Sequence, residues 1–189
     1  MRQIFFTLSL LISFFSYGQQ YGRPISDITT TGVGGGTFAS IDETTASDSD
    51  FVWTNDNTAA VYEVLLTTLT DPNTDSGHIL RYRVSKADGG VPNNNSGSVV
   101  TLNVELYQGA TQIQLIENTL ALGLWADRSL AFTPAFISSI TDYTDLRLRF
   151  TCTNSGGSPA NRRGMAISWA EIEIPDPSGP SPKRYFVIS

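Results

Sequence analysis

Cysteine is nearly absent from this chain of 189 residues, in which Cys152 is the only one. A single cysteine excludes a disulfide within the chain. It continues an alternating apolar series with Leu146, Leu148 and Phe150, which points its side chain inward. We therefore predict a buried, unreactive thiol, because a nucleophilic cysteine needs exposure and a lowered pKa.

Basic residues are also scarce. The chain has 12 Lys and Arg against 18 Asp and Glu, with a formal net charge of -6 and a sequence pI near 4.6. Phosphate binding needs a basic surface or at least a strong basic stripe. The composition therefore argues against a nucleic-acid partner.

Long hydrophobic runs are missing beyond the N-terminus. Arg2, the apolar stretch Ile4–Phe15 and the small residues that follow it predict a secretion signal peptide over residues 1–19. A retained N-terminal anchor is the alternative. No later segment approaches the ~18 apolar residues of a membrane span. We expect an exported protein that is extracellular, on the cell surface or periplasmic, without a membrane span after signal cleavage.

Strict alternation of apolar and polar residues predicts long strands with one buried face. It is clearest in Asp145–Thr153, Gly77–Ala87 and Val99–Gln108. In the first two stretches, arginine recurs on the outward face as an Arg-x-Arg pair. These four outward residues are Arg81, Arg83, Arg147 and Arg149.

Turn-forming residues separate the strands and leave little helical pattern. Gly32–Gly36 is predicted to be a flexible turn, and Asp88–Gly97 a long hairpin loop. Only Pro134–Tyr143, with apolar residues three to four apart, fits one or two helical turns. Several short strands with so little helix predict an all-β fold, an antiparallel β-sandwich.

The last strand, Met165–Ile174, shifts its alternation near Trp169–Ala170, which predicts a bulge. Pro175–Pro182 holds four prolines in eight residues and cannot continue a sheet. We therefore expect one domain over residues 20–174, then a proline-rich linker and tail over residues 175–189.

The order of these elements resembles the jelly-roll sandwiches of carbohydrate-binding modules and galactose-binding-like domains. The points of similarity are the strands His78–Val84, Val100–Leu106 and Asp145–Phe150, and a last strand ending Trp169–Glu173. The resemblance covers about two thirds of the chain. It implies a jelly-roll fold in which outward aromatics on a sheet, or loop tips, hold sugar rings.

The four arginines are the first candidate ligand site. If their strands are neighbours, the guanidinium groups gather and can grip carboxylate or sulfate groups, with Tyr107 adding an aromatic contact. The alternative is a charge ladder, in which acids on other strands pair with these arginines across the sheet. Those acids are Glu63, Glu105, Glu171 and Glu173.

An acidic loop is the second candidate, because calcium takes six to eight oxygen ligands. The resemblance implies a structural calcium near the first loop and the last strand. Its predicted ligands are Asp42, Glu43, Asp48, Asp50 and Glu173. A solvated acidic loop is the alternative, and the sequence indicates no other cofactor.

Aromatic residues are the third candidate. Trp53 and Trp125, in or near loops, can stack on a sugar ring, whereas Trp169 is expected in the core. His78, the only histidine, is expected to be hydrogen-bonded and structural, since a lone histidine makes a transition-metal site improbable.

These observations favour a secreted, non-catalytic binding module for glycan or another extracellular surface ligand. The alternative is a structural or assembly β-domain of a cell surface, filament or virion, since a terminal strand at Arg184–Ile188 can add to a neighbour's sheet edge. A jelly-roll polysaccharide lyase, whose chemistry uses Arg, His and Tyr together, comes third because its Gln-x-His strand motif is absent. The sequence indicates no catalytic residues and no oligomeric state.

Overall fold

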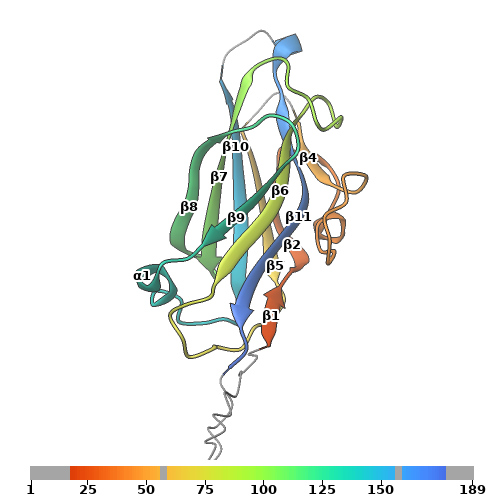
Figure 1. Ribbon diagram of the computed structural model, residues 1–189. Helices are drawn as coiled ribbons and strands as arrows, with labels where there is room; N and C mark the ends of the chain where they lie inside the picture. The colour runs from red at the N-terminus through yellow and green to blue at the C-terminus, as the bar shows by residue number, and fades with distance from the viewer. Residues whose placement is uncertain (1–17, 56–58, 156–158, 178–189) are drawn as a thin grey trace, which may run out of the picture.

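The computed structural model describes residues 18–55, 59–155 and 159–177, which form two antiparallel sheets packed face to face (Figure 1). The strands run from Gln19 to Pro175. The expected signal peptide lies outside the described residues except for its last two positions. The tail from residue 178, with the predicted strand Arg184–Ile188, also lies outside them.

We call the two sheets A and B. The strand order in sheet A is β3-β4-β11-β6-β9, with β1 also paired to β11, and in sheet B it is β2-β5-β10-β7-β8. Sheet A contains β1 (Gln19–Gly22), β3 (Val33–Gly35), β4 (Val52–Thr54), β6 (Ile79–Ala87), β9 (Ala126–Ala131) and β11 (Gly164–Pro175). Sheet B contains β2 (Pro24–Thr31), β5 (Ala60–Leu66), β7 (Val99–Gln108), β8 (Thr111–Ala121) and β10 (Leu146–Ser155).

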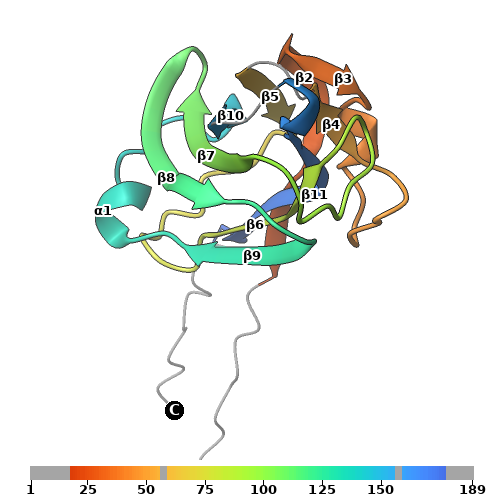
Figure 2. The same ribbon diagram turned by 90° about the horizontal axis from the view of Figure 1, so that it is seen from above.

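The strand order is that of a jelly roll. From β4 onward the chain passes from one sheet to the other at every connection except the β7–β8 hairpin. The four strands β4-β11-β6-β9 therefore face β5-β10-β7-β8, as the view from above shows (Figure 2). This is the double-sheet arrangement of eight antiparallel strands. The predicted fold class is confirmed.

In the part of the chain that the structure describes, helix is limited to short turns. The helical turn α1 (Pro134–Ile137) is capped by Thr133, whose side chain accepts a hydrogen bond from the backbone N–H of Phe136. Two 3-10 turns cover Phe38–Ser40 and Pro159–Asn161. The helical turn predicted after Pro134 is therefore confirmed, although it ends well before Tyr143.

The core lies between the two sheets and is built from the inward side chains of the alternating strands. Phe150 on β10 is fully buried and meets Tyr82 of β6 edge to face, with ring centres 5.9 Å apart. Cys152 continues the same inward series and is 1% exposed. Each large apolar side chain buried in this way contributes about 1.5–3 kcal/mol.

A bulge in β11 changes which residues face outward. The register of β11 against β6 shifts between Ile167 and Trp169, so the extra residue Ser168 is accommodated and buried. Trp169 then lies opposite Arg83 on the outer face of sheet A. The bulge was predicted correctly, but the expectation that Trp169 lies in the core is wrong because the bulge reverses the alternation.

Two loop predictions also need correction. Within Gly32–Gly36 only the two end residues have positive φ, and Val33–Gly35 forms a strand paired with β4. Asp88–Gly97 does not close a hairpin, because it connects β6 of sheet A to β7 of sheet B. In the part of the chain that the structure describes, no helix has the length and apolarity to cross a membrane.

Candidate functional site

The outer face of sheet B carries a group of polar side chains around Arg149. Alternation along β10 turns Arg147, Arg149 and Thr151 outward. Arg149 lies opposite Glu63 on β5 and opposite Glu105 on β7. We call this surface the Arg149 face and define it by its outward residues: Glu63, Asn103, Glu105, Tyr107, Arg147, Arg149 and Thr151.

Arg149 is held on three sides at the centre of this face. Its Nε donates to Glu63 Oε2 at 2.7 Å, and its Nη2 lies 2.5 Å from the same oxygen. Its Nη1 donates to the Tyr107 hydroxyl at 2.6 Å, while the guanidinium carbon lies 3.9 Å from the centre of the Tyr107 ring. Tyr107 as a whole is 7% exposed. An incoming ligand therefore meets the guanidinium plane rather than the aromatic face.

Arg147 completes the arrangement from the neighbouring outward position. Its Nη1 lies 3.6 Å from Glu63 Oε1, and its Nε donates to Asp145 Oδ1 at 3.0 Å. The hydrogen bond with Asp145 raises the pKa of the Arg147 guanidinium. Burial raises the pKa of the Tyr107 hydroxyl. Both groups therefore keep their protons at neutral pH, and the hydroxyl stays a neutral hydrogen-bonding group.

Two more polar side chains, Asn103 and Glu105, extend the face along β7. Asn103 accepts a hydrogen bond from the Thr119 backbone N–H through its Oδ1 at 2.7 Å. Glu105 is bonded by the Gln112 amide at 3.3 Å. Because these side chains stand on paired strands, their positions are fixed by the sheet rather than by loops.

The other two arginines lie on the opposite side of the sandwich. Arg81 stands on the outer face of sheet A between its partners Glu171 and Glu173 on β11. Glu171 also binds the guanidinium of Arg23 at 2.9 Å. The expected gathering of four arginines is therefore wrong, because β6 belongs to sheet A and β10 to sheet B. The alternative, charge pairs across neighbouring strands, describes both the Arg81 pairs on sheet A and the Glu63 pairs on sheet B.

Arg83 fastens a loop onto sheet A. Its Nε and Nη2 donate to the two carboxylate oxygens of Asp48 at 2.6 and 2.9 Å, and its Nη1 donates to Asp127 at 3.0 Å. The guanidinium carbon also lies 5.6 Å from the Trp125 ring centre. These contacts raise the pKa of Arg83 and lower that of Asp48, chiefly through the hydrogen bond between the two. Arg83 thus holds the 42–51 segment in place.

The three tryptophans are all partly buried on the side of sheet A. A methyl group on Gly34 or Gly90 would come within 3 Å of the Trp53 ring, so backbone lies directly against that ring. Trp125 meets Phe51 at 6.2 Å between ring centres. Trp169 donates its indole N–H to the backbone oxygen of Glu43 at 2.9 Å. The predicted roles of Trp53 and Trp125 in sugar stacking stay predictions.

The predicted calcium ligands are spread over several partners. Asp48 is engaged by Arg83, and Glu173 by Arg81. Burial, with the nearby charges of Asp50 and Asp42, raises the pKa of Glu43. Within residues 18–55, 59–155 and 159–177, no group of three or more His, Cys, Asp and Glu side chains gathers as a metal would require. Calcium binding stays a prediction.

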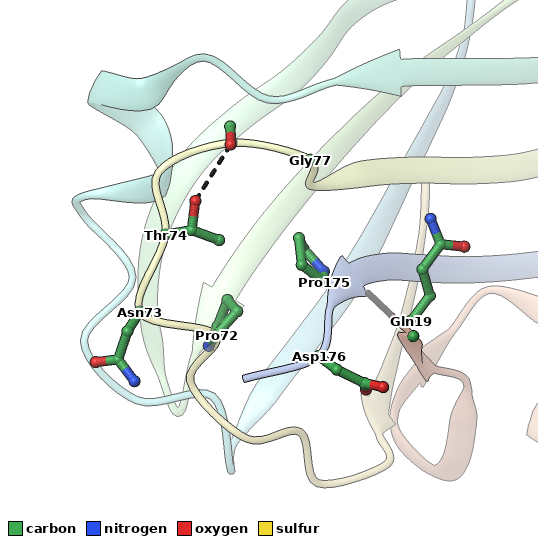
Figure 3. A pocket seen from close by; sticks show the side chains of 9 residues that line it. Gln19, Pro72, Asn73, Thr74, Gly77, Pro175 and Asp176 are labelled. Carbon is green, nitrogen blue, oxygen red and sulfur yellow. Dashed lines mark hydrogen bonds between the residues drawn. The ribbon is translucent and has the colours of Figure 1, made fainter. Parts of the chain in front are cut away.

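A cleft of about 450 Å³ opens at the base of the sandwich, between the 71–77 loop and the ends of β1 and β11 (Figure 3). The hydroxyls of Thr74 and Ser76 bond each other there at 3.2 Å. The predicted site residues lie elsewhere. The cleft is lined by Gly18, Gln19, Pro72, Asn73, Thr74, Ser76, Gly77, Pro175 and Asp176.

His78 is buried and hydrogen-bonded through both ring nitrogens, as expected from the sequence. It is 1% exposed, with Nδ1 3.2 Å from the Ser76 backbone oxygen and Nε2 2.8 Å from the Tyr143 hydroxyl. Since the carbonyl can only accept, Nδ1 carries the proton and Nε2 accepts from Tyr143. Burial lowers the pKa of His78, which favours this neutral form.

Sequence reasoning found the arginines but missed several of their partners. Asp48, Asp127 and Asp145 were not expected to bind them, although Asp145 is two residues from Arg147 and directly precedes β10. That spacing is a usable signal. Asp48 lies in the 42–51 segment and Asp127 lies opposite Arg83 on β9, so both pairs depend on the path of the chain, which the sequence does not reveal.

No protein-family model matches this chain, and no curated protein matches it. Among solved structures, it is similar to one described as "CBM4 structure and function" (13% identity, 78% of this chain and 94% of that chain, TM-score 0.40). It is also similar to the xylan-binding module CBM15 (11% identity, covering 86% of this chain and 94% of that chain, TM-score 0.36). A third similar structure is that of infectious bursal disease virus, Gt strain (11% identity, covering 96% of this chain and 39% of that chain, TM-score 0.39). Two of the three are carbohydrate-binding modules, and all three TM-scores are below 0.5.

Proposed function

We propose that this chain is an exported, non-catalytic module that binds glycan through the Arg149 face. One observation carries the proposal. A partly exposed guanidinium is locked at the centre of a row of hydrogen-bonding side chains, all of them on strands. Side chains that are already ordered lose little conformational entropy when a ligand binds.

Sugar hydroxyls suit this arrangement chemically. A hydroxyl both donates and accepts hydrogen bonds, and this face offers N–H donors beside carboxylate and amide oxygens. Bonds with an ionised partner are roughly twice as strong as neutral ones. Arg149 provides such a donor and Glu105 such an acceptor, and they are directly opposite on neighbouring strands.

The geometry also supports binding to an extended chain rather than to a small molecule. The outward residues follow β7 and β10 in register, from Tyr107 opposite Arg147 to Asn103 opposite Thr151. A strand rises about 3.3 Å per residue, so these positions span roughly 13 Å. That length accommodates two to three sugar rings in a row.

The test compares two alanine variants on opposite faces. Arg149→Ala removes the central donor, and Arg81→Ala removes an arginine that is equally well paired but lies on sheet A. Affinity electrophoresis and calorimetry on a panel of neutral and acidic polysaccharides measure binding. Loss of one charged hydrogen bond costs about 1.5–3 kcal/mol, so we expect roughly tenfold to hundredfold weaker binding for Arg149→Ala.

Arg81→Ala is expected to bind like the wild type. Absence of binding by the wild type to every polysaccharide tested would refute the proposal. An equal loss in both variants would also refute it, because the effect would then come from general destabilisation rather than from the Arg149 face.

A further inference from the structure

Glu63 is a buried acid on an outward face. Its side chain is 2% exposed, although alternation along β5 turns it toward solvent. The cause is its position between two arginines, with Arg149 on one carboxylate oxygen and Arg147 on the other. A buried carboxylate is tolerated when it is paired and hydrogen-bonded. Glu63 therefore pairs with both arginines of the face, and Asp145 supplies the second negative charge.

The charges of the face do not suit an anionic ligand. Arg147 and Arg149 are its two cations, while Glu63, Glu105 and Asp145 are three carboxylates on or beside it. The surrounding chain adds to this balance, because its formal net charge is -6. A uronate or sulfate group would have to displace Glu63 from the arginines and approach Glu105 as well.

An uncharged sugar meets no such competition. The guanidinium of Arg149 has five N–H groups, and its contacts within the described part of the chain engage three of them. The remaining two can donate to hydroxyls without disturbing Glu63. The ion pairs keep both arginine side chains in place for this contact.

We infer that the Arg149 face selects uncharged glycans, and that Glu63 is the positioning residue that sets this selectivity by holding both arginines in ion pairs. The inference rests on the proposed function and names the ligand class of the same site. It replaces the sequence-based expectation that these arginines grip carboxylate or sulfate groups.

The experiment measures charge selectivity with two variants that change the charge equally. Glu63→Gln removes the carboxylate that pairs with both arginines. Glu105→Gln removes a carboxylate of the same face that is bonded by Gln112, so both arginines keep their ion pairs. The probes are a neutral polysaccharide that the wild type binds and polygalacturonate, each titrated at 20 and 500 mM NaCl. Far-ultraviolet circular dichroism verifies the fold of each variant.

We expect wild-type affinity for the neutral probe to change less than twofold between the two salt concentrations, and affinity for polygalacturonate to be at least tenfold weaker. Glu63→Gln should bind polygalacturonate about tenfold more tightly than the wild type at low salt, which corresponds to about 1.4 kcal/mol. Glu105→Gln should gain less than threefold. The gain should vanish at high salt because exposed charges are then screened.

The outcomes separate the two proposals. Wild-type binding to polygalacturonate as tight as to the neutral probe would overturn the inference and leave glycan binding standing. Equal gains in the two variants, or no gain in Glu63→Gln, would overturn the role of Glu63. Binding to neither class of polysaccharide would overturn the proposed function itself. If Glu63→Gln fails to fold, the salt dependence and probe preference of the wild type still decide the selectivity.

Discussion

Replacing Arg83 by alanine should release the 42–51 segment from sheet A. Arg83 forms a two-pronged contact with Asp48 and a single bond with Asp127. It also stands over the Trp125 ring. Because the segment is otherwise fixed near its start, where Trp169 bonds the Glu43 backbone oxygen, the loss should be felt at its centre.

The magnitude follows from the exposure of the partners. The Asp48 side chain is 44% exposed, and that of Asp127 is 72% exposed. Solvent therefore reduces the two-pronged pair to about 1 kcal/mol and the second pair to a few tenths. The stacking on Trp125 adds about 0.5–1 kcal/mol. We expect Arg83→Ala to lower the free energy of unfolding by about 2 kcal/mol, or the midpoint of thermal unfolding by about 4–8 °C.

Hydrogen exchange read by mass spectrometry is the assay that localises the effect, and urea unfolding gives its size. Arg83→Lys is the matched control, since it keeps the charge but cannot form the fork or stack equally well. We expect the lysine variant to lose about half as much stability. Faster exchange in Arg83→Ala should be confined to residues 42–51 and the neighbourhood of Trp125.

The pH dependence provides a second check with a definite sign. Asp48 has its pKa lowered below the ordinary value of 3.8, so the unfolded chain binds this proton more tightly than the folded one. The stability from the pair is therefore present above pH 3.8 and is lost as the pH falls through the lowered pKa. Unchanged exchange in the 42–51 segment, or a stability difference that persists at lower pH, would refute the reasoning.

Three further changes test the fold. Gly34→Ala should destabilise the protein by about 1–3 kcal/mol in urea unfolding, because the new methyl group would lie 2.1 Å from the Trp53 ring, whereas Gly123→Ala should cost less than half as much. The midpoint of thermal unfolding should fall as the pH decreases from 7.5 to 5. The reason is that the pKa of buried His78 is lowered in the folded protein, so the unfolded chain binds the His78 proton more tightly. His78→Gln should flatten this pH dependence. Phe150→Ala should cost about 3–5 kcal/mol by the same urea assay, and a loss below 1 kcal/mol would contradict its place in the core.

Period-two alternation by itself determined the β-sandwich and the inward series of β6, β7 and β10. That pattern is local, because successive side chains of a strand always point to opposite faces. The same rule identified the outward arginines, the inward cysteine and the bulge near Trp169. The bulge was visible because it interrupts the alternation within one strand.

Only the tertiary structure decided which outward residues share a surface. Arg81 and Arg149 have the same local pattern, but their strands belong to different sheets, so they stand on opposite sides of the molecule. Strand order depends on how connections cross between sheets, and the sequence pattern within a strand is the same whichever sheet it joins. For this reason the sequence identified the arginines, whereas the fold assigned Glu63 to two of them and Asp48 to another.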